Sequence, residues 1–432
     1  MREYLKPLLL CMGLLVLLST SLFAANNKAI LLDIDGAIGP ATQDYIKRGL
    51  LTAQRNHASA VILQINTPGG LESATRNINE AIIASPVPVI AYVAPAGARA
   101  ASAGTFIMYA SHIAAMAPGT NIGAASPIDL ASIETTRPAR TAEKKMMSDA
   151  TAYLQSLAEL RDRNISFATQ AVRNSASISA DEAMRTKVIN IVANNYPELL
   201  QKADGQKINL DGREAKVLTT KNMEIETITP DWRYRFLTFI TNPNVAYLMM
   251  LLAIYGLFFE LSNPGLVLPG VAGFISLLIV LYAFQLMPID YVGLTLILVG
   301  IAFMIFEVFI SSFGVLGIGG VIAFIIGSIM LFDTEDPHFM LALPLVLAMS
   351  ILSSAFFLLV LNLAIRSHKR AIITGQEGLI GSHGTVLSVD NERLVVRVMG
   401  EIWDAKSTNT LKPGNKVRVT DVQGLVLTVE QA

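Results

Sequence analysis

"ARAASAGTFIMYASHIAAMAPGTNIGAAS", residues 98–126, gathers small side chains around one serine, Ser102, and holds a single charged residue, Arg99. A helical pattern begins directly after Ser102, which places this serine at the start of a helix. Small neighbours allow the backbone to turn sharply and allow an extended chain to approach closely. A nucleophilic serine needs such an exposed turn, together with a base and N–H donors for an oxyanion. The stretch therefore predicts a nucleophilic turn at Ser102.

The segments around this turn alternate between two patterns. Apolar runs typical of buried strands cover residues 28–39, 59–70 and 87–95, and helical spacing covers residues 42–55 and 71–85. This alternation predicts an α/β domain with a mostly parallel sheet, which we place at residues 26–230. The second strand ends in Pro68-Gly69-Gly70, a natural place for free backbone N–H groups.

Few residues of this domain can act as the base for Ser102. His57 lies in a polar loop, and His112 follows Ser102 by ten residues, about 15 Å along a helix. A Ser-His-Asp triad is therefore not expected. A lysine can replace histidine when burial keeps its amine neutral. Lys144 and Lys145, at the start of a predicted helix, are the candidates, although, taken alone, they fit a solvated helix face better.

A membrane domain is predicted at residues 237–365, which contain no Lys or Arg. Five hydrophobic spans, each near the length of a transmembrane helix, cover residues 245–261, 266–286, 291–310, 314–332 and 340–364. "FFELSNPGLVLPG" and "FEVFISSFGVLGIGG" resemble each other, each with an acid, Glu260 or Glu307, before a glycine-rich start of the next span. We expect these glycines to pack helices closely in lipid.

The N-terminus determines the expected orientation. Residues 1–25 have basic, apolar and small-residue parts in the order of a cleaved secretory signal peptide. The domain at 26–230 would then lie outside the cytoplasm, and five spans would place the C-terminus inside. Arg366, Lys369 and Arg370 after the last span agree with the positive-inside rule, whereas Arg233 and Arg235 before the first span do not. We therefore expect a multi-pass protein of the inner (plasma) membrane.

Residues 372–432 alternate apolar and polar positions between glycine-bearing turns, which predicts a small OB-like β-barrel. Its only aromatic residue is Trp403, and it has no basic stripe, so a nucleic-acid site is not expected. The apolar strands "LVVRV" and "LVLTV" suggest edges on which a protein partner could dock. The only cysteine, Cys11, lies in the predicted signal peptide, which excludes disulfides and cysteine-ligated metals in the mature chain.

Three motifs carry a resemblance to a known family: "INTPGG", the stretch around Ser102, and "KMMSDATAYLQSLAELRDRN". They resemble the long form of the NfeD family, membrane-bound serine proteases of the ClpP class related to the SppA-type signal peptide peptidases. The resemblance covers nearly the whole chain after the signal peptide. It implies a ClpP/crotonase-like protease domain, a membrane domain and an OB-like barrel.

The resemblance also implies roles for individual residues. Ser102 matches the family's nucleophile, and the position of Asp149 selects Lys145 over Lys144 as the base. Backbone N–H groups near Gly69, Gly70 and Ala103 would hold the oxyanion. Two residues depart from the family pattern, because Ser148 replaces an asparagine and Asp162 replaces a glycine. No metal or cofactor is implied.

The implied function is a serine endopeptidase with a Ser-Lys dyad that cleaves apolar segments of membrane-associated proteins. The implied partner is a stomatin-like (SPFH) membrane protein, and we also expect a homo-oligomer, a dimer or larger. Two alternatives stay open. Acyl-CoA chemistry uses the same fold, but secretion argues against a cytoplasmic substrate. A non-catalytic scaffold that regulates stomatin-like proteins is the stronger alternative, and the Ser102–Lys145 pair favours the protease over it.

Overall fold

The structure is a computed structural model that describes residues 28–127, 137–210, 215–265, 267–310, 314–332, 339–368, 376–390 and 393–432. The chain divides into two units, Met1–Gly300 with Ile322–Ser350, and Ile301–Val321 with Ile351–Ala432. The predicted signal peptide lies outside the described residues, as do Lys369 and Arg370.

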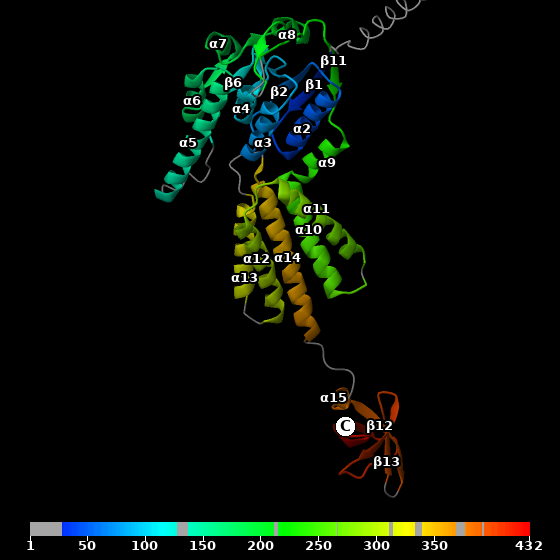
Figure 1. Ribbon diagram of the computed structural model, residues 1–432. Coiled ribbons are helices and arrows are strands. Elements are labelled where there is room, and N and C mark those ends of the chain that lie inside the picture. The colour runs from blue at the N-terminus through cyan, green and yellow to red at the C-terminus, as the bar shows by residue number, and fades with distance from the viewer. Residues whose placement is uncertain are drawn as a thin grey trace, which may run out of the picture. The chain divides into compact units, whose positions relative to one another are not determined.

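A six-stranded sheet forms the centre of the N-terminal domain (Figure 1). Its order is β11 (Glu224–Ile228), β1 (Lys28–Asp35), β2 (Ala60–Asn66), β3 (Val89–Val93), β5 (Ile113–Met116) and β8 (Ile191–Val192). All neighbours are parallel, and the three predicted strands are confirmed as β1, β2 and β3. Every residue of β3 and β5 is buried, because a parallel sheet is covered on both faces.

Helices and two small sheets surround this sheet. The helices are α2 (Pro40–Arg55), α3 (Glu72–Ile83), α4 (Ala103–Ala110), α5 (Arg137–Leu160), α6 (Ile165–Arg173), α7 (Ala180–Arg185) and α8 (Tyr196–Ala203). The small sheets are β4 (Arg99–Ala101), β6 (Asn121–Gly123) and β7 (Ser177–Ser179), and β9 (Lys207–Ile208) with β10 (Lys216–Val217). The helical spacing of α2 is confirmed, because Ile46, Leu50 and Ala53 are buried.

One helix begins earlier than expected. The sequence places Lys144 and Lys145 at a helix start, but α5 already begins at Arg137. Pro138 occupies the second position, where its fixed φ and missing N–H suit the first turn of a helix. Both lysines therefore lie inside the helix, about two turns from its start.

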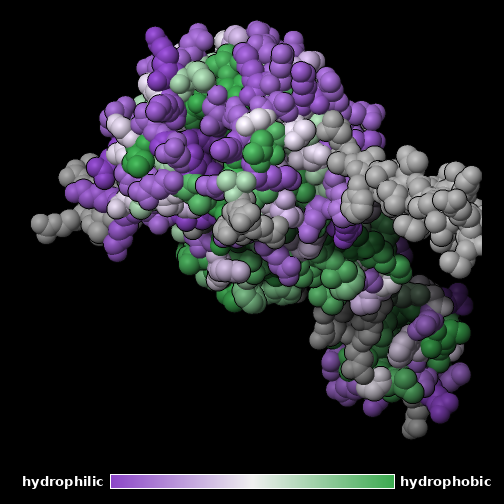
Figure 2. All heavy atoms as spheres, turned by 45° about the horizontal axis from the view of Figure 1, so that its top comes forward, coloured by the Kyte–Doolittle hydropathy of each residue, from purple (hydrophilic) through white to green (hydrophobic). Residues whose placement is uncertain are grey.

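Five apolar helices follow the short helix α9 (Trp232–Ile240). They are α10 (Pro243–Ser262), α11 (Leu268–Leu286), α12 (Tyr291–Phe309), α13 (Val315–Met330) and α14 (Leu343–His368), and each coincides with one predicted hydrophobic span. Among the described residues, α10 and α11 are long and apolar enough to cross a membrane, and the other three contain shorter apolar stretches. In Figure 2 the surface over the α/β domain is largely hydrophilic, whereas large hydrophobic areas cover the helices.

The glycines of the repeated motif divide between two roles, chain turns and close helix packing. Gly265 and Gly314 turn the chain with φ of 112° and 91°, and a Cβ on either would meet open space. Their N–H groups donate to Glu260 Oε1 (3.3 Å) and Glu307 Oε1 (2.9 Å). Close helix packing, as expected, involves Gly270 of the motif, where a Cβ would lie 2.7 Å from Glu260 Cγ of α10. Outside the motif, Gly256 also lies directly against Gly273 of the neighbouring helix.

The C-terminal domain is a closed five-stranded barrel in the order β12 (His383–Asp390), β13 (Arg393–Val398), β14 (Glu401–Lys406), β16 (Val426–Gln431) and β15 (Lys416–Gln423), preceded by α15 (Gln376–Leu379). The predicted barrel is thus present. The expected apolar strand edges are wrong, since β13 and β16 are each paired on both sides. Their apolar residues Val396, Val398, Leu427 and Val429 fill the barrel core, against which Trp403 packs.

Candidate active site

Ser102 occupies a strained turn between β4 and α4. Its backbone has φ 49° and ψ −113°, a conformation that costs non-glycine residues about 1–3 kcal/mol. The turn is fixed on both sides, since Ser102 N–H donates to Gly123 O (3.0 Å) and Ser102 O accepts from Thr105 N–H (2.9 Å). The hydroxyl does not cap α4. A half-buried hydroxyl at a helix N-terminus is thus left available for chemistry.

Two buried threonines hold this turn, and sequence reasoning missed both. The Thr105 hydroxyl lies 2.9 Å from both Ala100 O and Gly123 O, and it accepts from Gly123 N–H (3.1 Å). Thr67 pairs with β4, because its N–H donates to Arg99 O (2.8 Å) and its O accepts from Ala101 N–H (3.1 Å). An isolated polar residue inside an otherwise buried run is the sequence signal that could have identified them.

The glycines at the end of β2 lie beside Ser102. A Cβ on Gly69 would lie 2.9 Å from Ser102 Cβ and 3.3 Å from Ser102 Oγ, and Gly69 has φ 136°. The Gly69 N–H lies 3.1 Å from Thr67 Oγ1 and donates to it. The N–H groups of Gly70 and Ala103 make no hydrogen bond to any residue in the described part of the chain. These two amides, on the residues that follow Gly69 and Ser102, are therefore free to donate.

We expect Gly69→Ala to lower any activity of Ser102 at least about 100-fold, because the new Cβ would displace the serine and strain the loop. Gly119→Ala is the matched control, since Gly119 also has a positive φ (74°) but a Cβ there meets nothing within 4 Å. The control should lose about 1 kcal/mol of stability and keep its activity. Equal losses of activity in the two variants would contradict the contact.

Neither histidine of the domain lies near Ser102. His112 follows the far end of α4, is buried, and accepts from Val89 N–H through Nδ1 (3.1 Å). Burial, with Arg161 and Arg163 nearby, lowers the pKa of His112 to about 3. His57 is exposed in a loop. Neither of these two histidines can thus act as the base for Ser102, as the sequence predicts.

The neutral state of His112 makes stability depend on pH. Between an unfolded pKa near 6.5 and a folded pKa of about 3, only the unfolded chain binds the proton. Stability is therefore complete above pH 6.5 and falls by about 1.4 kcal/mol per unit below it. We expect the free energy of opening of the β3 amides to fall by about 2 kcal/mol between pH 7.5 and pH 5. Hydrogen exchange, corrected for the intrinsic exchange rate at each pH, measures it. His112→Asn keeps an acceptor for the Val89 N–H but does not titrate. An equally steep loss of protection in this variant would show that His112 is not the cause of the pH dependence.

Lys145 is exposed on α5, as is Lys144. The helix is attached to α3 and α4 further along, because Asp149 pairs with Arg76 and Tyr153 stacks on Phe106 (5.7 Å between ring centres). No hydrogen bond among the described residues joins Lys145 to Ser102, and the preceding residues 128–136 lie outside them. The structure thus brings together Ser102, Gly69, Gly70 and Ala103, but it does not bring Lys145 into contact with them.

A buried arginine holds the far end of α4. Arg163 donates to the carbonyl oxygens of Met108 (2.6 Å), Tyr109 (2.8 Å) and Ser111 (2.9 Å). Burial lowers its pKa to about 9, so it stays charged at neutral pH and neutralises the negative end of the helix. Asp162 before it has φ 51°, a conformation that glycine adopts without strain and aspartate tolerates. This explains why the family pattern has glycine at this position.

Comparison with known proteins agrees with this architecture along the whole chain. Family models match three consecutive parts: the NfeD1b N-terminal domain over residues 29–228, the NfeD integral membrane domain over 244–363, and the NfeD-like C-terminal, partner-binding domain over 376–431. The membrane-bound protease PH1510 of Pyrococcus horikoshii is 35% identical over 434 residues, which cover 98% of each chain. This chain belongs to the NfeD family.

Three further proteins are similar to parts or to all of this chain. The membrane protein NfeD1b of Bacillus subtilis is 27% identical over 99% of this chain and 98% of its own. The solved 1510-N membrane protease specific for a stomatin homolog from Pyrococcus horikoshii is 34% identical, with a TM-score of 0.42, covering 50% of this chain and 98% of its own. The C-terminal domain of the stomatin operon partner protein 1510-C from that organism is 41% identical, with a TM-score of 0.13, covering 14% of this chain and 95% of its own.

Proposed function

We propose that this chain is a membrane-bound serine endopeptidase with Ser102 as nucleophile. The observation that carries the proposal is the strained Ser102 turn, with Gly69 against the serine side chain and free backbone N–H groups on the next residues, Gly70 and Ala103. Such donors stabilise the oxyanion of acyl transfer. The full-length relative from Pyrococcus horikoshii, named a membrane-bound protease, supports the same reaction.

In this mechanism Ser102 Oγ attacks the scissile carbonyl carbon, and Lys145, as a neutral amine, accepts the hydroxyl proton. The Gly70 and Ala103 N–H groups bind the oxyanion, with Gly69 providing the space for Ser102. Lys145 returns its proton to the leaving amine, and the C–N bond breaks. Water then hydrolyses the acyl-enzyme with Lys145 again as base. Lys145 makes no hydrogen bond to Ser102 among the described residues, so in this proposal the two side chains meet when substrate is bound.

We propose apolar segments of membrane-associated proteins as substrates and a stomatin-like membrane protein as partner. The same proposal includes a ClpP/crotonase-like fold and a homo-oligomer. It also includes three domains, with the limits 26–230, 237–365 and 372–432. A further part is an orientation with the protease domain outside the cytoplasm and the barrel inside, with five membrane-crossing helices. The five apolar helices and the matching integral membrane domain support it.

The full-length protein in lipid nanodiscs tests this function directly. We expect it to cleave a stomatin-like membrane protein, or quenched-fluorescent peptides of its apolar segments, with new termini found by mass spectrometry. A folded, lipid-embedded protein that cleaves none of them between pH 6 and 9 would favour the scaffold alternative.

The barrel has a candidate surface for partner docking at one end. The parallel strands β14 and β16 begin at the same end of the barrel, where both preceding hairpin turns lie. Three exposed apolar residues gather at this end: Met399 (59% exposed), Ile402 (65%) and Leu425 (79%). Met399 also has a positive φ of 51°, a backbone conformation that is uncommon for residues other than glycine. We propose these three residues, the apolar end of the barrel, as the docking surface for the partner.

Charged substitutions test this docking surface. Ile402→Asp with Leu425→Asp should reduce crosslinking of the full-length protein to a stomatin-like partner at least tenfold, because each removes buried apolar area from the contact. Val389→Asp is the matched control, since Val389 is also exposed (45%) but lies at the opposite end of the barrel. Unchanged crosslinking in the double variant would rule out this surface.

A further inference from the structure

The helix between the α/β domain and the first apolar helix has the composition of a membrane-interface helix. One face of α9 is buried, where Leu237 and Ile240 pack with Ala41 of α2 and Ala283 of α11. The remaining surface of α9 exposes Trp232 (73%), Phe236 (40%) and Phe239 (58%), together with Arg233 and Arg235. Aromatic rings with basic side chains collect where the hydrocarbon meets the lipid headgroups.

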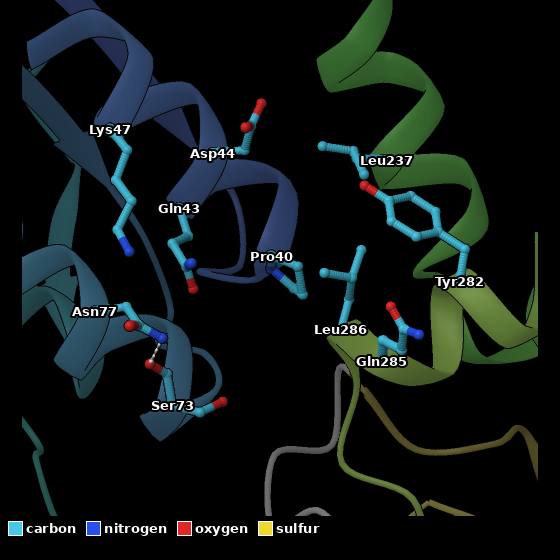
Figure 3. A pocket seen from close by; sticks show the side chains of 10 residues that line it. All are labelled: Pro40, Gln43, Asp44, Lys47, Ser73, Asn77, Leu237, Tyr282, Gln285 and Leu286. Carbon is cyan, nitrogen blue, oxygen red and sulfur yellow. Dashed lines mark hydrogen bonds between the residues drawn. The ribbon is translucent and has the colours of Figure 1, made fainter. Parts of the chain in front are cut away.

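Beside α9 lies a polar hollow of about 320 Å³, at the lower end of the size range of small-molecule sites. Residues of α2, α3, α9 and α11 line it: Pro40, Gln43, Asp44, Lys47, Ser73, Asn77, Leu237, Tyr282, Gln285 and Leu286. Figure 3 shows the polar ends of Lys47, Gln43 and Asn77 gathered on one side, with the end of α11 facing them. We refer to it as the α2–α11 hollow.

The charges of the α2–α11 hollow favour an anion. Lys47 forms no ion pair with any residue in the described part of the chain. The neighbouring carboxylate of Asp44 is already paired with Arg48 (2.7 Å), which also binds Asp231 (2.8 Å). Amide and hydroxyl donors complete the lining, as in sites that bind phosphate oxygens. One unpaired ammonium group with several neutral donors suits a single phosphate.

An apolar track leads from the hollow along α11. Tyr282, Leu278 and Phe274 are spaced four residues apart, so they lie on one face of the helix. Each is about half exposed, at 46%, 53% and 54%. A free phosphate needs no such track, whereas the acyl chain of a phospholipid does.

We propose that the α2–α11 hollow binds the phosphate of an anionic phospholipid, whose acyl chain lies along this face of α11, and that α9 lies in the same headgroup layer. The lipid would seat the α/β domain on the membrane surface. Ser73, which lines the hollow, follows Gly70 of the candidate active site by three residues in the sequence. The proposal also accounts for Arg233 and Arg235, which conflict with the positive-inside rule but fit a headgroup layer. It does not depend on the protease activity.

Lipid retention tests the hollow. The full-length protein in detergent, supplied with phosphatidylglycerol or phosphatidylcholine, is examined by native mass spectrometry. We expect phosphatidylglycerol to be retained several-fold better, and Lys47→Gln to lower this retention at least fivefold. Lys207→Gln, an exposed lysine outside the hollow, should leave it unchanged. Equal retention by Lys47→Gln and the unchanged protein would overturn the proposal.

Competitors identify the occupant. Millimolar inorganic phosphate or glycerol 3-phosphate should displace little of the lipid, because neither fills the apolar track. Full displacement by inorganic phosphate would indicate a free-anion site and overturn the lipid assignment. Displacement by an apolar peptide, with loss of its binding in Lys47→Gln, would indicate a substrate groove and would overturn it as well.

Fluorescence quenching tests α9 independently. The chain has two tryptophans, so Trp403→Phe leaves Trp232 as the single probe. In nanodiscs, lipids brominated near the headgroup should quench Trp232 more strongly than lipids brominated near the chain end. Absence of quenching at every depth would place α9 in water and contradict the proposed layer.

Discussion

Replacing Ser102 by alanine is expected to lower peptide cleavage by at least about 10⁴-fold while the protein stays folded. The hydroxyl makes no capping bond to α4, so its removal costs the fold little, whereas the reaction loses the atom that forms the acyl-enzyme. Initial rates with a quenched-fluorescent peptide measure the loss, and circular dichroism checks the fold.

Ser148→Ala is the control for this variant, because Ser148 is exposed on α5 next to the proposed base region. It should keep at least half of the activity. A folded Ser102→Ala protein with full activity would remove Ser102 from the mechanism and return attention to the scaffold alternative.

Lys145→Ala should reduce cleavage to nearly the same degree as Ser102→Ala, because a nucleophile and its base act as one unit. Lys144→Ala should have a mild effect, although both side chains are exposed on the same turn of α5. Adjacent residues point about 100° apart around a helix, so only one can face Ser102. The measurement is kcat/KM for both variants in nanodiscs.

The pH profile adds a readout that a structural role would not give. Cleavage should rise with pH, because only the neutral amine of the base accepts the serine proton. The residual activity of Lys145→Ala should lack this rise. A severe loss in Lys144→Ala with a mild one in Lys145→Ala would show that the helix register is off by one residue.

The sequence was sufficient to predict those helices and strands in which apolar residues recur in a regular pattern. Continuous apolar runs identified β1, β2 and β3, and their burial on both faces is the physical reason for those runs. The five apolar helices and the barrel followed from length and alternation. The three-residue strands β4, β6 and β7 have no detectable period, so the small sheet that supports Ser102 could not be anticipated.

The candidate site was predictable in type but not in detail. Small residues around Ser102 and the Gly69-Gly70 pair signalled a close approach, and the structure places them side by side. The role of Arg163 was hidden, because an arginine in a polar helix end is usually solvated, and its three carbonyl partners come from a helix more than fifty residues earlier. The position of Lys145 relative to Ser102 depends on how α5 packs against α3 and α4, which local sequence does not encode.

The pairing of β1 with β11 has a consequence for biogenesis. Lys28 of β1 aligns with Glu224 of β11. β1 therefore cannot pair with β11 until nearly the whole domain has been translated. Ile228 precedes Pro243, the first residue of α10, by only 15 positions. Closure of the sheet and insertion of the first long apolar helix therefore fall at almost the same moment of synthesis. A secreted fragment that stops before Glu224 would expose β1 as an open edge, which invites strand exchange between copies and aggregation.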